Sequence, residues 1–170
     1  MIIEYLTTDE PLTLDEVKAQ CRVDGDAEDA YLAGVIIPGA RALAESKSGC
    51  AIRAARYSDI VLDVGRCVLS MGGVTAVESV KVDGADVAFA ETAEARRTYI
   101  TAPGSAGKKG VITYTAGIDI DNHPGARAWM LLICGWLYAQ REMLVGTPIN
   151  EPPPHIAESL LASIAVPAGF

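Results

Sequence analysis

Residues 13–52, TLDEVKAQCRVDGDAEDAYLAGVIIPGARALAESKSGCAI, decide how the rest of the chain is interpreted. They predict two helices joined by a tight acidic turn. The Thr13 hydroxyl can cap the first helix, and Glu16, three residues later, completes a capping box. Gly25 suits the left-handed conformation that ends a helix. The stretch therefore favours a helical pair and contains no set of catalytic side chains.

The second helix of this pair is expected to begin at Asp26, whose carboxylate can cap its first turn. Gly49 marks its end. Pro38 lies in the middle and should kink it, because proline removes a backbone donor and clashes with the preceding turn. An apolar stripe on one face predicts the buried side, formed by Leu32, Val35, Ile36, Leu43 and Ala44.

Residues 53–118 change to the alternation that is typical of strands. About six short antiparallel strands are expected, in one small sheet, at 57–64, 67–71, 74–82, 86–90, 98–101 and 111–115. Asp83-Gly84 is the strongest hairpin signal. Residues 91–97 are interpreted as a polar connector, and residues 102–110 as a mobile loop rich in Pro, Gly, Ser and Lys.

The two ends complete an α+β fold in a single domain, residues 1–170. An extended segment precedes the helical pair within 1–52 and is expected to pair with a sheet or a neighbouring subunit. A core helix is expected at 122–146, opened by Asn122 or His123 as cap and Pro124 in the first turn. A Pro-rich linker, a short helix starting at Pro154 and a tail follow in 147–170. The architecture is thus mainly helical, with the β segment 53–118 inserted.

The composition is that of a globular protein, with 50% hydrophobic and 21% charged residues in 170. The formal net charge of −8 argues against a strong electrostatic grip on DNA. The four cysteines have neither CxxC nor His spacing, so free and mostly buried thiols are expected. The longest apolar run, 128–139, is too short to span a bilayer, and no membrane partner is expected.

No cofactor-binding, metal-binding or catalytic motif is present, and a binding or structural protein is favoured over an enzyme. The alternative is a small ligand-binding protein or enzyme that uses Asp119, Asp121 and His123, since a His–Asp pair can transfer protons. A helix-capping role for these three residues is the simpler interpretation.

Taken as a whole, the chain resembles the head–tail connector, or adaptor, family of tailed bacteriophages and prophages, in the branch with a β insertion. The resemblance rests on the order of the elements and on residues in three segments: Leu14, Glu16, Val17, Lys18, Arg22, Asp24 to Asp29, Ala40, Arg41 and Gly49; Val111, Thr113, Tyr114, Ala116, Gly117, Pro124, Ala126, Ala128, Leu131, Tyr138, Arg141 and Glu142; and Ile156, Leu160 and Leu161. Pro38-Gly39 departs from the unbroken helix usual in relatives.

The resemblance implies a virion assembly protein without enzymatic activity, located at the head–tail junction and in the host cytoplasm during assembly. It implies a homo-oligomeric ring of about a dozen subunits. The implied partners are the portal protein and a head-completion or tail protein, with DNA passing through the lumen without sequence-specific binding. Contacts with sister copies or partners are expected at Lys108, Lys109, Arg141, Glu142, Ile156, Leu160, Leu161 and Phe170. Removing the residues after Gly146 is expected to impair docking and leave the fold largely intact.

Overall fold

The computed structural model describes the backbone of residues 1–141 and 154–167, and the side chains of 1–141 and 158–167. The chain divides into two compact units. Unit 1 comprises Met1–Thr8, Gly49–Ile118 and Ala165–Phe170, and unit 2 comprises Asp9–Ser48 and Asp119–Ile164. Unit 1 is built of strands and unit 2 of helices, so the expected α+β class is confirmed at this level. The expected single domain stays a prediction.

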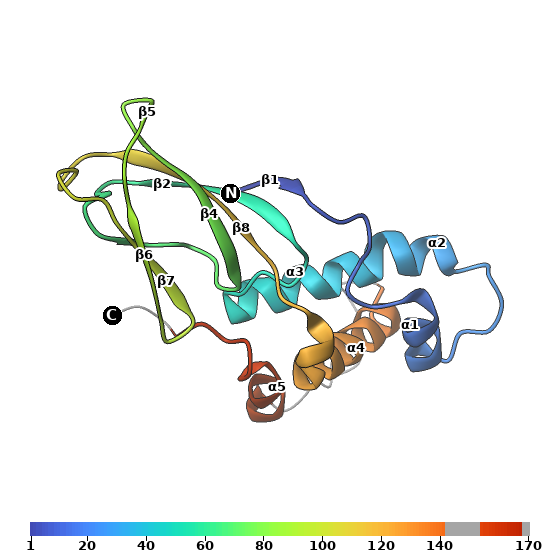
Figure 1. Ribbon diagram of the computed structural model, residues 1–170. Helices are drawn as coiled ribbons and strands as arrows, with labels where there is room; N and C mark the ends of the chain where they lie inside the picture. The colour runs from blue at the N-terminus through green and yellow to red at the C-terminus, as the bar shows by residue number, and fades with distance from the viewer. Residues whose placement is uncertain (142–153, 168–170) are drawn as a thin grey trace. The chain divides into compact units, whose positions relative to one another are not determined.

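Unit 1 contains two antiparallel sheets where one was expected. The five-stranded sheet has the order β1-β2-β8-β4-β5 and the three-stranded sheet the order β3-β7-β6. Figure 1 shows β1, β2, β8 and β4 side by side, with the β4–β5 hairpin projecting at one end. The strands are β1 (Ile2–Tyr5), β2 (Ala55–Val61), β3 (Cys67–Val68), β4 (Val74–Val82), β5 (Ala85–Asp86), β6 (Ala90–Glu94), β7 (Arg97–Thr101) and β8 (Gly110–Ala116). Strand β1 pairs with β2, which confirms the expected pairing of the N-terminal segment with a sheet.

The core of unit 1 lies on one face of the five-stranded sheet, because side chains alternate between the two faces of a strand. Tyr57 and Asp59 of β2, and Ile112 and Tyr114 of β8, are buried. The rings of Tyr57 and Tyr114 are stacked, with centroids 5.5 Å apart and an interplanar angle of 15°. Side chains at the alternate positions of these strands, such as Ile60 (67% exposed), lie on the opposite face of the sheet.

The hairpin signal at Asp83-Gly84 is confirmed. Both residues have positive φ, 52° and 81°, and they connect β4 to β5. This is the pattern of a type I′ turn, whose twist matches that of the flanking strands. Gly84 can adopt this conformation without strain because it has no Cβ.

The interpretation of residues 91–97 as a connector is wrong, since β6 occupies Ala90–Glu94 and pairs with all of β7. Every side chain of β6 is exposed, so no buried face imposed an alternation of polar and apolar residues. The turn to β7 uses Ala95 (φ 49°) and Arg96 (φ 65°), residues that rarely take this conformation. The strand expected at 86–90 is also shorter, ending at Asp86.

Unit 2 begins with helix α1 (Leu14–Cys21), and its predicted capping box is confirmed. The Glu16 backbone N–H donates to Thr13 Oγ1 (3.3 Å), and the Thr13 backbone N–H donates to Glu16 Oε2 (2.9 Å). The helix ends at Arg22, which adopts the left-handed conformation itself (φ 56°). Gly25 (φ 78°) lies three residues later in the acidic turn, so the predicted stop residue was wrong.

The second helix of the pair is made of three pieces: α2 (Asp29–Tyr31), the π-helical η1 (Leu32–Ile36) and α3 (Ile37–Ser48). Asp26 provides no side-chain cap, so that expectation was wrong. The π-turn, closed by the Ile37 N–H on the Leu32 carbonyl, comes directly before Pro38. The expected kink at Pro38 stays a prediction, and the wider turn makes room for the proline ring. A π-turn also changes which side of the helix the following residues occupy. Val35 (54% exposed) and Leu43 (45% exposed) therefore lie outside the buried stripe to which both were assigned.

Helix α4 (Pro124–Ala139) is the element against which α1, α3 and α5 (Pro154–Leu161) all pack. Pro124 occupies the first turn, as predicted, and η2 (Ile120–Asn122) precedes it. The helix ends at Ala139, with Gln140 as its last cap, and not at 146. None of the described helices has both the length and the apolar character that are required to cross a bilayer.

A buried ion cluster joins the start of unit 2 to α3. Arg41 (5% exposed) donates from Nε to Glu10 Oε2 (2.7 Å) and from Nη1 to Glu45 Oε2 (3.0 Å). Its Nη2 also reaches Glu10 Oε1 at 3.3 Å. Removing the cation would leave two carboxylates facing each other away from water, which is strongly unfavourable.

We predict that Arg41→Ala lowers the free energy of unfolding of unit 2 by about 3–5 kcal/mol, the usual cost of breaking a buried ion pair. Both tryptophans belong to α4, so urea denaturation followed by tryptophan fluorescence reports on this unit. Lys47→Ala, on the exposed side of the same helix, is the matched control. Equal unfolding midpoints for the two variants would contradict the role given to the cluster.

Candidate functional site

One end of unit 1 carries an exposed surface of mixed apolar and basic character, which we call the tip surface: Ile60, Leu62, Arg66, Lys108, Lys109 and Val111. Ile60 and Val111 are direct cross-strand partners on the outer face of the sheet. Leu62, just past the end of β2, is 81% exposed, and Val111 is 39% exposed. Burial of such side chains against another molecule is favourable, so this end of unit 1 is a candidate interaction site.

Two loops build the tip surface, and hydrogen bonds join them. Asp63 Oδ1 accepts from the backbone N–H of Gly65 and of Gly107, each at 2.8 Å. The Val64 N–H donates to the Lys108 carbonyl at 3.0 Å. The loop 102–110 is therefore attached to residues 63–65, which brings the backbone of Lys108 next to Val64.

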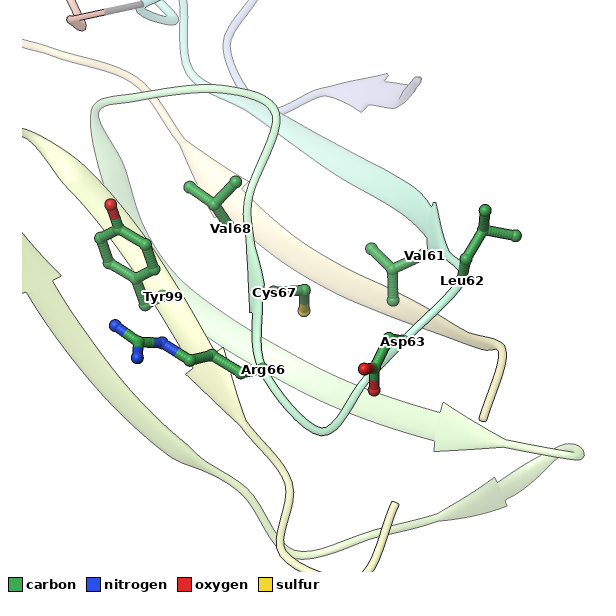
Figure 2. Close-up of a pocket in the computed structure, with 7 residues that line it drawn as sticks. All are labelled: Val61, Leu62, Asp63, Arg66, Cys67, Val68 and Tyr99. Atoms are coloured by element: carbon green, nitrogen blue, oxygen red, sulfur yellow. The ribbon is translucent and has the colours of Figure 1, made fainter. Parts of the chain in front are cut away.

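An open cavity of about 570 Å³ adjoins this surface, lined by Val61, Leu62, Asp63, Arg66, Cys67, Val68 and Tyr99. Figure 2 shows the Arg66 side chain extended beside the Tyr99 ring. The guanidinium carbon lies 5.7 Å from the ring centroid, within the range of a cation–π contact. Burial raises the pKa of the Cys67 thiol, and nearby Asp63 and Asp59 raise it further, so the sulfur is held in its less reactive protonated form.

The polar cluster at the centre of unit 1 is structural. The Asp59 carboxylate accepts from the Ser70 N–H (2.7 Å), the Ser70 hydroxyl (2.8 Å) and the Tyr114 hydroxyl (3.1 Å). Sequence reasoning missed it, because Asp59 and Tyr114 are 55 residues apart. Burial raises the pKa of Tyr114 from 10.0 to about 12, and the neighbouring Asp59 charge adds to this. The phenol thus stays protonated and donates to Asp59, attaching the segment before β4 to the sheet.

Residues Asp119, Asp121 and His123, the alternative catalytic set, lie at the η2–α4 junction. Asp119 caps η2, accepting from the Asp121 N–H and from Asn122 Nδ2, both at 3.0 Å. Asp121 forms an ion pair with Arg127. His123 holds the cap position of α4 without a side-chain cap, which corrects the prediction that its side chain or that of Asn122 caps this helix. These contacts match the helix-capping interpretation, and no observation favours the catalytic one.

The structure places the predicted contact residues in different settings. Lys108 and Lys109 are exposed on the tip surface. Arg141 is used within unit 2, where it pairs with Glu28 (2.8 Å) and lies over the Tyr138 ring (4.4 Å). Glu142, Phe170 and the Ile156 side chain lie outside the described residues.

The remaining two predicted contact residues belong to α5. Leu161 is 3% exposed and Leu160 is half-buried, with its carbonyl against Gly125 of α4. Ile164, just after the helix, is 2% exposed. The expectation that a chain ending at Gly146 would keep its fold was therefore wrong, because this truncation removes part of the core of unit 2.

The charge of the chain is divided unequally between the units. Unit 1 has eight basic and eight acidic residues and is neutral, whereas unit 2 has six basic and fourteen acidic residues and carries the whole −8. Within the described part of the chain, no group of three or more His, Cys, Asp or Glu is arranged to hold a metal ion. None of the four cysteines takes part in a disulfide, and Cys50 and Cys134 are buried whereas Cys21 and Cys67 are half-buried.

This combination of an antiparallel β unit and a helical unit is the fold of chains found in gene transfer agent particles. The chain is similar to one in a structure described as the neck of an empty gene transfer agent particle computed with C6 symmetry, with 19% identity, a TM-score of 0.71 and coverage of 100% of this chain and 97% of that chain. It is also similar to a chain in the virion of a native gene transfer agent particle, with 18% identity, a TM-score of 0.69 and coverage of 98% and 96%. No protein-family model and no curated protein matches the sequence.

We predict that unit 1 loses stability as the pH rises from about 10 to about 12. The folded-state pKa of Tyr114 is raised above its unfolded value of 10.0 to about 12, so its contribution is fully present below pH 10 and is lost above it. Tyr114→Phe should be less stable at pH 8, by about 1–3 kcal/mol, because Asp59 loses a donor. Its stability should then fall less steeply between pH 10 and 12. Urea denaturation followed by far-UV circular dichroism checks both statements, and identical pH profiles would contradict the second.

Proposed function

We propose that this protein is a structural subunit of the neck of a phage-like particle, acting as a head–tail connector. One observation carries the proposal: the likeness to a neck chain extends over essentially the full length of both chains, through the β unit as well as the helical unit. A shared fold alone does not define a function. The residues add support, because Asp119 and Asp121 of the alternative site are engaged in a helix cap and an ion pair.

In this proposal, copies of the chain form a closed ring of about a dozen subunits between the portal protein and the head-completion or tail proteins. The structure of the similar neck chain was computed with sixfold symmetry, and a ring of twelve is compatible with it. DNA passes through the lumen without sequence-specific binding. The strongly acidic unit 2 supports this, because its charge repels phosphates and gives DNA no surface on which to adhere. The ring would assemble in the host cytoplasm and remain at the head–tail junction.

The test is deletion of the reading frame in the host that produces the particles, followed by electron microscopy of the lysate. We expect DNA-filled heads and separate tails, because a missing connector prevents their union. Supplying the wild-type chain from a plasmid should restore whole particles. Tailed particles in normal number after deletion would contradict the proposed function.

A second expectation separates the structural role from the catalytic alternative. Replacing Asp119 by Asn and His123 by Gln together should leave the yield of whole particles within about twofold of wild type, provided the chain folds. Asp119 caps only the short η2 at the surface, a role worth about 1 kcal/mol, and His123 makes no side-chain cap. The measurement is particle counting after complementation of the deletion. Loss of particles with the chain folded and in normal amount would favour the alternative site.

A further inference from the structure

We propose that the tip surface of one copy docks on the acidic turn, Asp24-Gly25-Asp26, of the helical unit of a second copy. The inference rests on the proposed function, since it assigns the contact by which subunits join in the ring. A ring requires a heterologous contact, in which two different surfaces of the same chain are complementary. The two surfaces lie in different units and carry opposite charge.

The tip surface is preformed and apolar at its centre. Ile60 and Leu62 are 67% and 81% exposed, values that leave most of each side chain in water. The Asp63 carboxylate and the Val64–Lys108 hydrogen bond hold the two supporting loops together, so little order has to be gained on docking. Preformed surfaces of this kind bind with a smaller entropic cost.

The cations around this centre have no carboxylate partner among the described residues. Arg66 stacks on Tyr99, and neither Lys108 nor Lys109 forms an ion pair there. Three arginines of unit 2, Arg41, Arg127 and Arg141, are each paired with a carboxylate of the same unit, whereas the exposed Arg22 beside the acidic turn forms no ion pair among the described residues. Positive charge on the tip surface is therefore available to an acidic surface of another molecule.

The acidic turn offers the complementary features. Asp24 and Asp26 are exposed, and neither forms an ion pair within the described part of the chain, whereas Glu28 and Asp29 nearby are paired with Arg141 and Lys18. Val35, on the π-helical segment that follows this turn, is 54% exposed and gives Leu62 an apolar partner. Complementary charge of this kind orients the encounter, and burial of the apolar groups supplies the stability.

DNA is the alternative partner for the tip surface, because this surface carries two lysines and an arginine. The protein partner is favoured because a phosphate backbone offers nothing to the exposed Ile60 and Leu62, and because unit 1 has no net positive charge.

The experiment compares full-length variants by sedimentation equilibrium over a range of concentrations and salt. Lys108→Glu with Lys109→Glu should weaken self-association at least about tenfold, and Asp24→Lys with Asp26→Lys should do the same. A chain that carries all four changes should recover association to within about threefold of wild type, because the charges are exchanged and not removed. Lys47→Glu, an exposed lysine of α3, is the control and should have no effect. Leu62→Asp tests the apolar centre and should weaken association as strongly as the lysine pair.

Each outcome is decisive. If the wild-type chain associates and the tip variants behave like Lys47→Glu, the inference is wrong while the proposed function stands. If the double variants weaken association but the fourfold variant fails to recover, the two surfaces do not meet and the inference is also wrong. If Lys108→Glu with Lys109→Glu abolishes salt-sensitive binding of a DNA duplex and leaves self-association unchanged, the tip surface contacts DNA. A wild-type chain that stays monomeric throughout contradicts the inference and the ring together.

Discussion

Strand β8 is the constraint on which unit 1 depends. It is hydrogen-bonded along both edges, to β2 on one side and to β4 on the other, and these strands come from distant parts of the chain. Its Tyr114 stacks on Tyr57 and donates to Asp59, so the packing of the sheet and the position of the segment before β4 are set by one side chain. At its other end, Gly110 follows directly on the loop that carries Lys108 and Lys109. The close approach of Gly110 to the Lys81 carbonyl leaves no room for a Cβ, and this holds the loop against the sheet.

The two units of the chain differ in charge, and this difference supports the proposed role in assembly. A neutral β unit with a basic tip and a helical unit with a charge of −8 form a subunit with two unlike surfaces. Such a subunit is suited to contacts with copies of itself that continue around a ring and close. The internal polar groups are used differently: Arg41 and Asp59 each hold two or more parts of their own unit together. Buried charges thus stabilise the fold, and in the proposed assembly the unpaired exposed charges of the tip surface and the acidic turn contact other copies.

The elements that could be predicted are those in which a local rule is sufficient. The capping box of Thr13 and Glu16, the Asp83-Gly84 turn and the first-turn position of Pro124 each depend on neighbouring residues only. The missed elements depend on distant contacts or lack a local signal. Strand β6 is exposed on both faces and exists because β7 pairs with it, and the π-turn before Pro38 has no signal in the neighbouring residues that distinguishes it from an ordinary helical turn.

The candidate site could be predicted in part, for the same reason. Lys108 and Lys109 were predicted as contact residues from a basic loop, but Leu62 and Arg66 were not, because the two loops are joined by hydrogen bonds between residues 44 apart in sequence, such as Gly107 to Asp63 and Val64 to Lys108. Leu161 was assigned to a contact with a partner, although it is buried within unit 2. The sequence pattern of an apolar stripe on a short helix does not reveal whether the same chain or another chain covers it.

The central claim is that this chain is a component of the neck and has no separate role outside the particle. The most direct measurement is cryo-electron microscopy of purified particles labelled with a Fab fragment raised against the chain. The account predicts Fab density in a ring at the junction of head and tail and nowhere else on the particle. Fab density on the capsid or along the tail, or complete absence of the chain from purified particles, would contradict it.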